Sequence, residues 1–253
     1  MKTTLASASQ AGILAPVRAC GRSLTFRLRP ETDPAPTLKK LRVGFAIDWG
    51  VVGLGEPLLR ALRREVAGLR TFPALAGPAA PVPSTQQAFW VFLRGDDRSA
   101  IFERSQALLD LTGDVLALED AMDTFKYADD RDLSGYLDGT ANPTGEEGIA
   151  AALVASGQGL AGSSFVAVQR WVHDLRSFKA RPQAERDAII GRRLDNNDEI
   201  EDAPESAHVK RSEQESYDPP AFMMRRSMPW ATVRELGLEF IAFGSSLDPF
   251  ERM

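Results

Sequence analysis

Residues 88–93, with the sequence AFWVFL, decide how the first half of this chain folds. A run this apolar predicts an interior strand that is covered on both faces. The residues at 95–97, Gly-Asp-Asp, follow it with a turn and a helix cap, and they predict a helix over residues 97–111. The expected inner face of that helix consists of residues at helical spacing: Ile101, Ser105, Leu108 and Leu109.

The residues before this strand predict one strand and one helix. Apolar and polar residues alternate over 24–28, which is the period of a half-buried strand. The pattern leaves the state of residues 37–49 open. Pro57 stands at a first helical position, and the apolar spacing after it predicts an amphipathic helix over residues 57–69. Residues 71–85 are rich in proline and alanine and are expected to form a connection.

The second half repeats this order of elements. The pattern predicts a strand over 164–172 (SFVAVQRWV), a helix over 177–190, a strand over 207–212 and a strand over 238–243. Because the strands do not alternate strictly with the helices, we favour an α+β fold of two split β-α-β modules over one doubly wound parallel sheet. The modules are expected to span residues 1–130 and 131–253.

Composition narrows the class of protein. The chain has 253 residues, of which 43% are hydrophobic and 26% are charged, so it is long and apolar enough to bury a core. Its 30 Lys and Arg against 35 Asp and Glu give a net charge of -5, which disfavours nucleic acid as a partner. The single cysteine, Cys20, excludes an internal disulfide and indicates a reduced cytoplasmic location.

Neither export nor membrane insertion is expected. The N-terminal residues lack an apolar run of signal-peptide length. The longest uncharged run, residues 148–169, is interrupted by serine, glutamine and glycine, and we interpret it as a helix end, a loop and a strand.

Two motifs resemble ligand sites but lack the required context. Residues 157–162 match GxGxxG, yet they follow a helix-favouring run and precede a strand, which is the reverse of a dinucleotide site. The acidic run 195–202 resembles a calcium loop, but Ile200 and Ser206 occupy the positions of the turn glycine and the bidentate glutamate. Both stretches are better explained as loops.

Three further segments carry chemistry when they are taken together. The chain has two histidines, His173 and His208, and each alone is more simply explained as an ordinary hydrogen-bonded side chain. Residues 135–143 (GYLDGTANP) hold Asp138 in a turn between two glycines, where backbone can approach a ligand closely. Residues 225–230 (RRSMPW) place cations and a hydroxyl beside apolar residues.

With these segments in order, the sequence resembles the dye-decolourising peroxidases, which are haem enzymes with two ferredoxin-like modules. The resemblance rests on GILAPV, VPSTQQAFWVFLRGDD, GYLDGTANPTG, GSSFVAVQRWVHDL, IIGRRLDNNDEIEDAPESAHVKR and RRSMPW. It implies a peroxidase that binds haem b, reduces hydrogen peroxide and oxidises dyes or other bulky aromatic donors through a ferryl intermediate. It also implies a homo-oligomer, since related enzymes are often oligomeric.

The resemblance assigns roles to individual residues. It implies that His208 is the proximal iron ligand and that the distal side carries the catalytic carboxylate Asp138. The other implied residues are the distal arginine Arg225, the distal polar residue Ser227, Arg192 near the haem edge and Gly139, whose backbone approaches the cofactor. For bulky donors the electrons would pass through a surface aromatic residue, and the sequence leaves Trp171, Tyr136 and Tyr217 open.

One departure from the family pattern bears on these expectations. Similar proteins continue beyond the residues 248–253 with a helix, a closing strand and a carboxylate that bonds the proximal histidine. The second module is therefore expected to be incomplete here or to close differently. A haem-handling protein with little peroxidase turnover, or a ferredoxin-like module that binds no haem, is kept as an alternative.

Overall fold

The computed structural model describes residues 2–77 and 81–253, and side chains from residue 5 onward. Two compact units make up the chain, one of Gln10–Asp123 and one of Thr124–Met253 together with Met1–Ser9. The units divide within a strand, N-terminal to the boundary at 130 that the sequence led us to expect. Each unit is described by itself.

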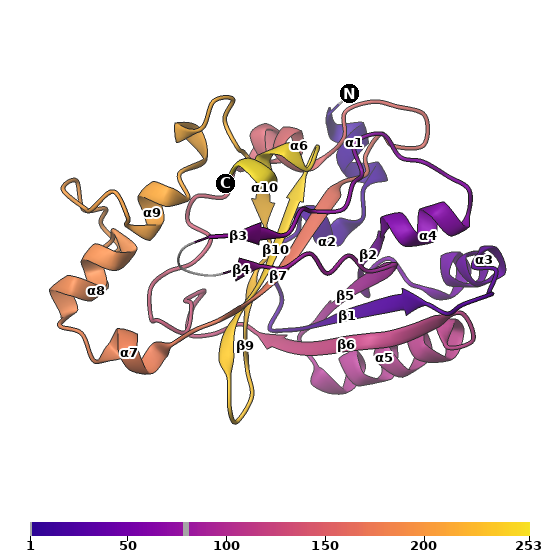
Figure 1. The fold of residues 1–253 in the computed structure, drawn as a ribbon, viewed down its shortest axis with the longest axis horizontal. Coiled ribbons are helices and arrows are strands. Elements are labelled where there is room, and N and C mark those ends of the chain that lie inside the picture. Colours follow the sequence, from indigo (N-terminus) through magenta and orange to yellow (C-terminus); the bar gives the residue numbers. More distant parts are fainter. Residues whose placement is uncertain (1, 78–80) are drawn as a thin grey trace. The chain divides into compact units, whose positions relative to one another are not determined.

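The unit Gln10–Asp123 is built around a four-stranded sheet with the strand order β2-β5-β1-β6 (Figure 1). Its elements are α2 (Ala11–Leu14), β1 (Cys20–Leu28), α3 (Ala35–Gly44), β2 (Gly50–Leu54), α4 (Glu56–Ala61), β3 (Leu75–Ala76), β4 (Pro81–Val82), β5 (Phe89–Gly95), α5 (Arg98–Thr112) and β6 (Leu116–Phe125). The order β1-α3-β2-β5-α5-β6 along the chain is a split β-α-β arrangement.

Strand β5 is the interior strand that its composition predicts. All of its residues except Arg94 are buried. It pairs antiparallel with β1 on one side and β2 on the other, and Val91 lies opposite both Leu24 and Val52. The helix predicted after it is confirmed as α5, where the Asp97 side chain caps the helix by accepting a hydrogen bond from the Ser99 N–H at 2.9 Å.

Two expectations for this unit differ from the structure in extent. The helix expected over 57–69 is α4, which ends at Ala61, and Arg63 takes a left-handed φ of 53° that a continuing helix does not allow. Residues 37–49, whose state the pattern left open, belong mostly to α3.

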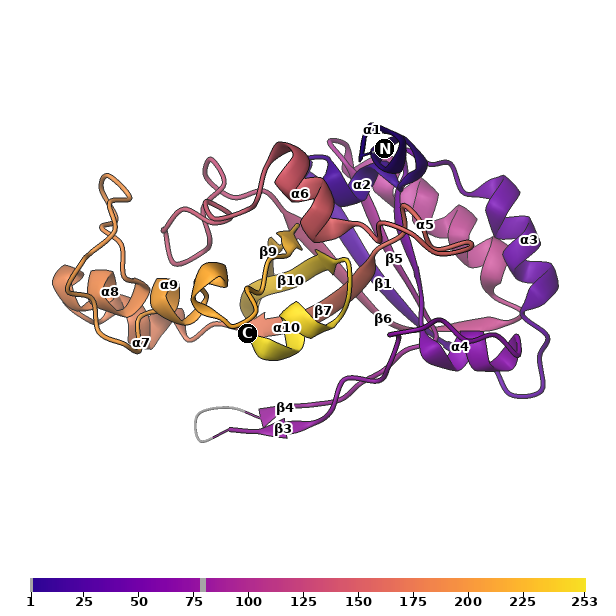
Figure 2. The ribbon, with the colours of Figure 1, turned by 90° about the horizontal axis from the view of Figure 1, so that it is seen from above.

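The second unit contains a sheet in which β7, β10 and β8 are neighbours, and β9 also pairs with β10. Its elements are α1 (Lys2–Ala8), α6 (Gly145–Ala152), β7 (Phe165–Val172), α7 (Leu175–Lys179), α8 (Gln183–Ile190), α9 (His208–Arg211), the 3-10 helix η1 (Gln214–Ser216), β8 (Met224–Arg225), β9 (Met228–Ala231), β10 (Leu236–Gly244) and α10 (Asp248–Arg252). Helices α6 and α10 contact β10 (Figure 2).

The sequence-based predictions for this unit need two corrections. The strand predicted over 207–212 is wrong, because His208–Arg211 form helix α9, in which the Ser212 N–H donates to the His208 carbonyl at 3.0 Å. A stretch this short does not distinguish a period of two from a helical turn. The helix predicted over 177–190 is two helices, because Pro182 lacks an N–H donor and separates α7 from α8.

The strands predicted over 164–172 and 238–243 are confirmed as β7 and β10, and the antiparallel sheets with helices confirm the α+β class. Residues 157–162 form a loop that precedes β7. Across the described residues, no helix is both long and apolar enough to cross a lipid bilayer.

A substitution at Gly237 tests the close pairing of β10 with β7. A Cβ at this position would lie 1.8 Å from the Trp171 carbonyl oxygen, which belongs to the backbone of β7 and cannot move aside alone. We expect Gly237→Ala to lower the free energy of unfolding by about 1–3 kcal/mol, the usual cost of overpacking. Gly95→Ala, where the nearest atom would be 3.4 Å away, is the control in denaturant unfolding. Equal stability of the two variants would contradict the tight register.

Candidate active site

Three of the predicted site residues come from separate segments of the second unit. Asp138 lies in the loop between β6 and α6, His208 is the first residue of α9, and Arg225 is the last residue of β8. The charges of all three act on one another: the pKa of Asp138 responds to Arg225 and His208, and that of His208 responds to Asp138 and Arg225. The fold thus brings together three residues that are far apart in the sequence.

The backbone of the Asp138 loop is folded back on itself. The Asp138 N–H donates to the Asp130 carbonyl at 2.9 Å, and the Gly139 N–H donates to Asp138 Oδ1 at 2.6 Å. Gly139 has a φ of +71°, which glycine adopts without the cost that a side chain would add. A Cβ here would also lie 3.3 Å from Asn142 Nδ2. Gly139 therefore supports the turn that presents Asp138.

Tyr136 anchors the same loop to α8. Its hydroxyl donates to Asp187 Oδ1 at 2.5 Å, and Gln183 Nε2 donates to the same oxygen at 2.6 Å. Burial and the Asp187 hydrogen bond raise the pKa of Tyr136. The residue is 3% exposed, so it lacks the surface that contact with a bulky electron donor requires. Trp171, at 44% exposed, has that surface.

A histidine–carboxylate pair fixes the start of the loop. His173 Nε2 lies 3.0 Å from Asp132 Oδ1, and the Ser134 N–H donates to Asp132 Oδ2 at 2.8 Å. Burial acts to raise the pKa of Asp132, but the hydrogen bonds from His173 and Ser134 outweigh it and lower the pKa to about 2. His173 thus has a hydrogen-bond partner within the protein, as its ordinary interpretation in the sequence requires.

Arg225 is held through its backbone. Its N–H donates to Asn142 Oδ1 at 2.7 Å, and Asn142 Nδ2 donates to its carbonyl at 3.2 Å. On the other side of the strand, Arg225 pairs with Ala242 of β10. The side-chain Nε is buried, and no hydrogen-bond acceptor lies near it in the described part of the chain. An unsatisfied buried donor of this kind is costly, but the Nε of Arg186 and of Arg252 has no partner among the described residues either, so the donor does not by itself mark a ligand position.

The electrostatic balance at Asp138 sets its protonation. Burial raises the pKa of Asp138, and the charge of Asp132 adds to this; the Gly139 hydrogen bond and the charges of Arg225 and His208 act in the opposite direction. Asp138 retains exposed surface, but surrounding protein removes part of the water that would stabilise its charge. Its carboxylate therefore accepts a proton more readily than an ordinary aspartate.

His208 presents a neutral imidazole. Burial lowers its pKa, with Arg225 acting in the same direction and Asp138 opposing it. The residue keeps exposed surface, and its ring nitrogens have no hydrogen-bond partner among the residues that the structure describes. A neutral, accessible imidazole nitrogen is the form of histidine that binds a metal ion.

The other two predicted side chains have partners within the protein. Ser227 Oγ accepts a hydrogen bond from the Ile241 N–H at 3.2 Å. Arg192 Nη2 lies 2.9 Å from Glu199 Oε2, and its Nη1 donates to the Asn197 carbonyl at 3.1 Å. Neither is among the charges that shift the pKa of Asp138 or His208, so the structure does not join them to that group.

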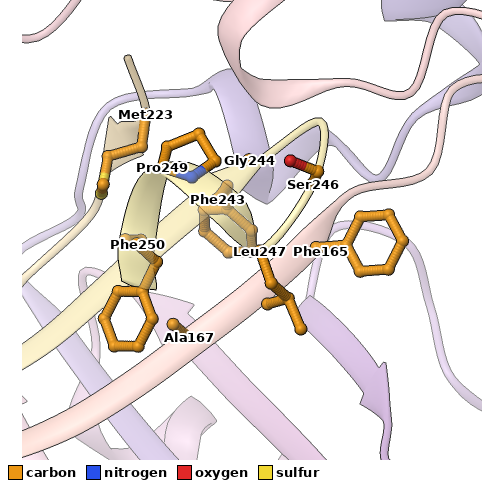
Figure 3. Close-up of a pocket in the computed structure, with 10 residues that line it drawn as sticks. Phe165, Ala167, Met223, Phe243, Gly244, Ser246, Leu247, Pro249 and Phe250 are labelled. Atoms are coloured by element: carbon orange, nitrogen blue, oxygen red, sulfur yellow. The ribbon is translucent and has the colours of Figure 1, made fainter. Parts of the chain in front are cut away.

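A small depression elsewhere in this unit is not the predicted site. It lies among β7, β10 and α10 and is lined mainly by apolar side chains, including Phe165, Phe243, Leu247 and Phe250 (Figure 3). None of the predicted site residues lines it.

Sequence reasoning missed the polar side chains that support the site. Asn142 and Gln214 bind backbone groups of distant segments, and Asp132 pairs with His173 across the fold. The only signal in the sequence was the position of Asn142 within the GYLDGTANP segment. Gln214 has no motif of its own.

Comparison with known proteins identifies the family. Residues 129–253 match the C-terminal domain of Dyp-type peroxidases. A dye-decolorizing peroxidase of Mycobacterium tuberculosis is 30% identical over 191 residues, which are 73% of this chain and 57% of that protein. One of Rhodococcus erythropolis is 30% identical over 224 residues, which are 83% of this chain and 65% of that protein. The chain spans less than two thirds of the length of both relatives.

Solved structures agree with these relatives. The Rhodococcus jostii protein DypB, in a variant crystallised in complex with heme, aligns with a TM-score of 0.84 at 25% identity over 96% of this chain and 85% of that one. A dye-decolorizing protein from V. cholerae aligns with a TM-score of 0.85 at 25% identity, over 95% of this chain and 85% of that one.

The antiparallel sheets with helices and the likeness to these solved structures define an α+β fold of the ferredoxin-like kind, as predicted. The chain belongs to the dye-decolourising peroxidase family.

The Asp132–His173 pair has a stability consequence that depends on pH. A pKa lowered from 3.8 to about 2 contributes stability above the unfolded-state pKa, and this contribution is lost as the pH falls through 2. We expect Asp132→Asn to lower the free energy of unfolding by about 2 kcal/mol at pH 7 and by about half as much near pH 3. Urea unfolding at both pH values measures this. A difference that is constant with pH would show that the carboxylate charge is not involved.

Proposed function

We propose that this chain is a haem-dependent peroxidase that binds haem b, reduces hydrogen peroxide and oxidises dyes or other bulky aromatic donors. The observation that carries the proposal is the mutual electrostatic influence of Asp138, Arg225 and His208, three residues from separate segments. A carboxylate, a guanidinium and a neutral imidazole are the groups that peroxide activation beside a haem iron requires.

The residues present fit a haem. His208 supplies an accessible imidazole without a protein partner, which is suited to bind the iron. Arg225 supplies a buried guanidinium whose Nε lacks an acceptor in the described residues. The backbone at Gly139 allows close approach beside the ring. We further propose that Arg192 lies near the haem edge, held there by Glu199.

Proton movement at the site would be the work of Asp138. Haem, when bound, would supply the redox chemistry by which peroxide is reduced and a donor is oxidised. Asp138 Oδ2 would take a proton from one oxygen of hydrogen peroxide and return it to the other, outer oxygen, which leaves as water. The raised pKa of Asp138 makes both halves of this transfer accessible.

Arg225 would stabilise the charge that develops on the outer oxygen. Burial lowers the pKa of Arg225, with Asp138 and Glu215 opposing it, and the group stays cationic because an arginine pKa is far above neutrality. A preorganised cation in such surroundings acts on the transition state without reorganising. We propose that Ser227 contributes a polar group on the same side through its hydroxyl hydrogen.

We also propose that the protein is cytoplasmic and forms a homo-oligomer. A cytoplasmic location agrees with the single cysteine, and the net charge of -5 does not favour nucleic-acid binding. The homo-oligomer rests on the resemblance to related enzymes. Of the three aromatic residues that the sequence left open, we propose Trp171 as the entry point for a bulky donor's electrons, because it is exposed on β7 while Tyr136 is buried and Tyr217 is half-buried.

The first test of the function compares the two histidines. We expect His208→Ala to lose the Soret spectrum of the haem-reconstituted protein, because the neutral imidazole of His208 is the proposed iron ligand. His173→Ala, which removes the partner of Asp132, should keep that spectrum and is the matched control. Retention of the parent spectrum by His208→Ala would refute the ligand assignment, and a parent protein that stays colourless after haem addition would refute the function.

The second test uses the raised pKa of Asp138. A base must be ionised, so the rate of the peroxide-dependent change in the haem spectrum should fall as the pH drops through that pKa. We expect Asp138→Asn to slow this rate roughly 100-fold at neutral pH and to remove the acid limb, because the amide accepts no proton. Stopped-flow spectra over a pH series measure it. Parent rates at every pH would exclude the base role, and a Soret band without any reaction in the parent would favour the haem-handling alternative.

A further inference from the structure

We infer that Gln214 is a positioning residue that sets the place of Arg225 relative to Asp138. This inference rests on the proposed function, since it concerns the reactivity of Arg225. Gln214 lies in η1, which follows the His208 helix α9 along the chain. Along the chain, the residue thus lies between α9, which carries His208, and β8, which carries Arg225.

The side chain of Gln214 joins two of these segments directly. Its Nε2 donates to the Ala141 carbonyl at 2.7 Å, and its Oε1 accepts from the Met223 N–H at 2.8 Å. Ala141 belongs to the loop of Asp138, and Met223 precedes the strand that ends in Arg225. The residue is only 1% exposed, so water does not compete for these bonds.

The backbone of Gln214 adds a third connection. Its carbonyl accepts a hydrogen bond from the Ala221 N–H at 2.8 Å, so the chain leaving η1 returns to the same residue before β8 begins. A buried carboxamide that uses donor, acceptor and backbone in this way has little freedom to move. Its position in turn limits that of Met223.

Asn142, one residue after Ala141 in its own loop, continues the same pattern. Its partner Arg225 lies two residues after Met223 in the other segment. Its side-chain amide exchanges two hydrogen bonds with the backbone of Arg225, as a neighbouring strand would do. Gln214 thus pairs Ala141 with Met223 while Asn142 pairs with Arg225. The two carboxamides together occupy the edge of β8 that faces away from β10.

These backbone contacts matter because the guanidinium of Arg225 is not fixed by its own hydrogen bonds. Its buried Nε has no acceptor in the part of the chain that the structure describes. The backbone of β8 then sets the position from which the Arg225 side chain reaches the site. A displacement of about 1 Å at a catalytic group is enough to slow a reaction roughly 100-fold.

The chemistry of the two bonds excludes simple replacements. Methionine has a similar length, but it leaves the Met223 N–H and the Ala141 carbonyl unsatisfied. Glutamate keeps the acceptor for Met223 and places a negative charge against the Ala141 carbonyl. We therefore expect both Gln214→Met and Gln214→Glu to release β8 from the Asp138 loop, by different routes.

The experiment is a double-mutant cycle that reads the position of Arg225 without turnover. Fluoride on ferric haem is stabilised by a nearby hydrogen-bond donor, so its Kd reports where the guanidinium lies. We expect Gln214→Met to raise the fluoride Kd about tenfold in the parent background and less than twofold in Arg225→Leu. The exposed Gln158→Met is the matched control and should leave the Kd unchanged.

The outcomes separate this inference from the proposed function. An equal effect of Gln214→Met in both backgrounds would overturn it, because Gln214 would then act without Arg225. A parent-like Kd in Gln214→Glu would overturn it too, and this variant serves where Gln214→Met does not fold.

Amide exchange gives a reading that needs no haem. If the parent bound no haem, the proposed function would fail, but faster amide exchange at Met223 and Arg225 in the Gln214 variants of the full chain would still support the positioning. Exchange at the parent rate would refute it.

Discussion

The antiparallel pairing of β10 is the interaction on which the second unit depends. This strand pairs with β7 along its whole length and uses its other edge for β8 and β9. Ser227 lies between β8 and β9. Its hydroxyl oxygen accepts a hydrogen bond from the Ile241 N–H of β10. Because β10 fixes Arg225 opposite Ala242, the loop of Asp138 has a defined edge against which to pack. The site is therefore assembled on a sheet and not on loops alone.

Burial of charge explains why the site needs this support. Partial removal of Asp138, Arg225 and His208 from water shifts each pKa toward the neutral form. Opposite charges nearby counter the shift, and at Asp138 the Gly139 hydrogen bond does so as well. Such a balance depends on distance, because a charge interaction in surroundings of low dielectric weakens quickly when the partners separate. The anchors of the Asp138 loop, through Asp132 and Tyr136, keep that distance fixed.

The sequence predicts the parts of this structure that local pattern determines. The strands over 88–93, 164–172 and 238–243 follow from apolar runs, and α5 follows from its cap and spacing. Strand β6 was missed because its apolar residues are separated by Glu119, Asp120 and Asp123, of which Glu119 and Asp123 are exposed and Asp120 is half-buried. The strand predicted over 207–212 was wrong because a single turn is decided by its tertiary surroundings. The site residues came from resemblance, and their grouping required the fold.

Long-range backbone recognition is what the sequence did not reveal. A side-chain amide carries the same donor and acceptor as a peptide group, so Asn142 and Gln214 can take the place of a strand at the edge of β8. Their partners are main-chain atoms of other segments, and main-chain atoms leave no trace in residue type. A glutamine of this kind is found only by checking each buried polar group for its hydrogen-bond partner. The same check on Arg225 Nε finds no partner in the described residues, so its guanidinium, unlike the two carboxamides, is left available to a ligand.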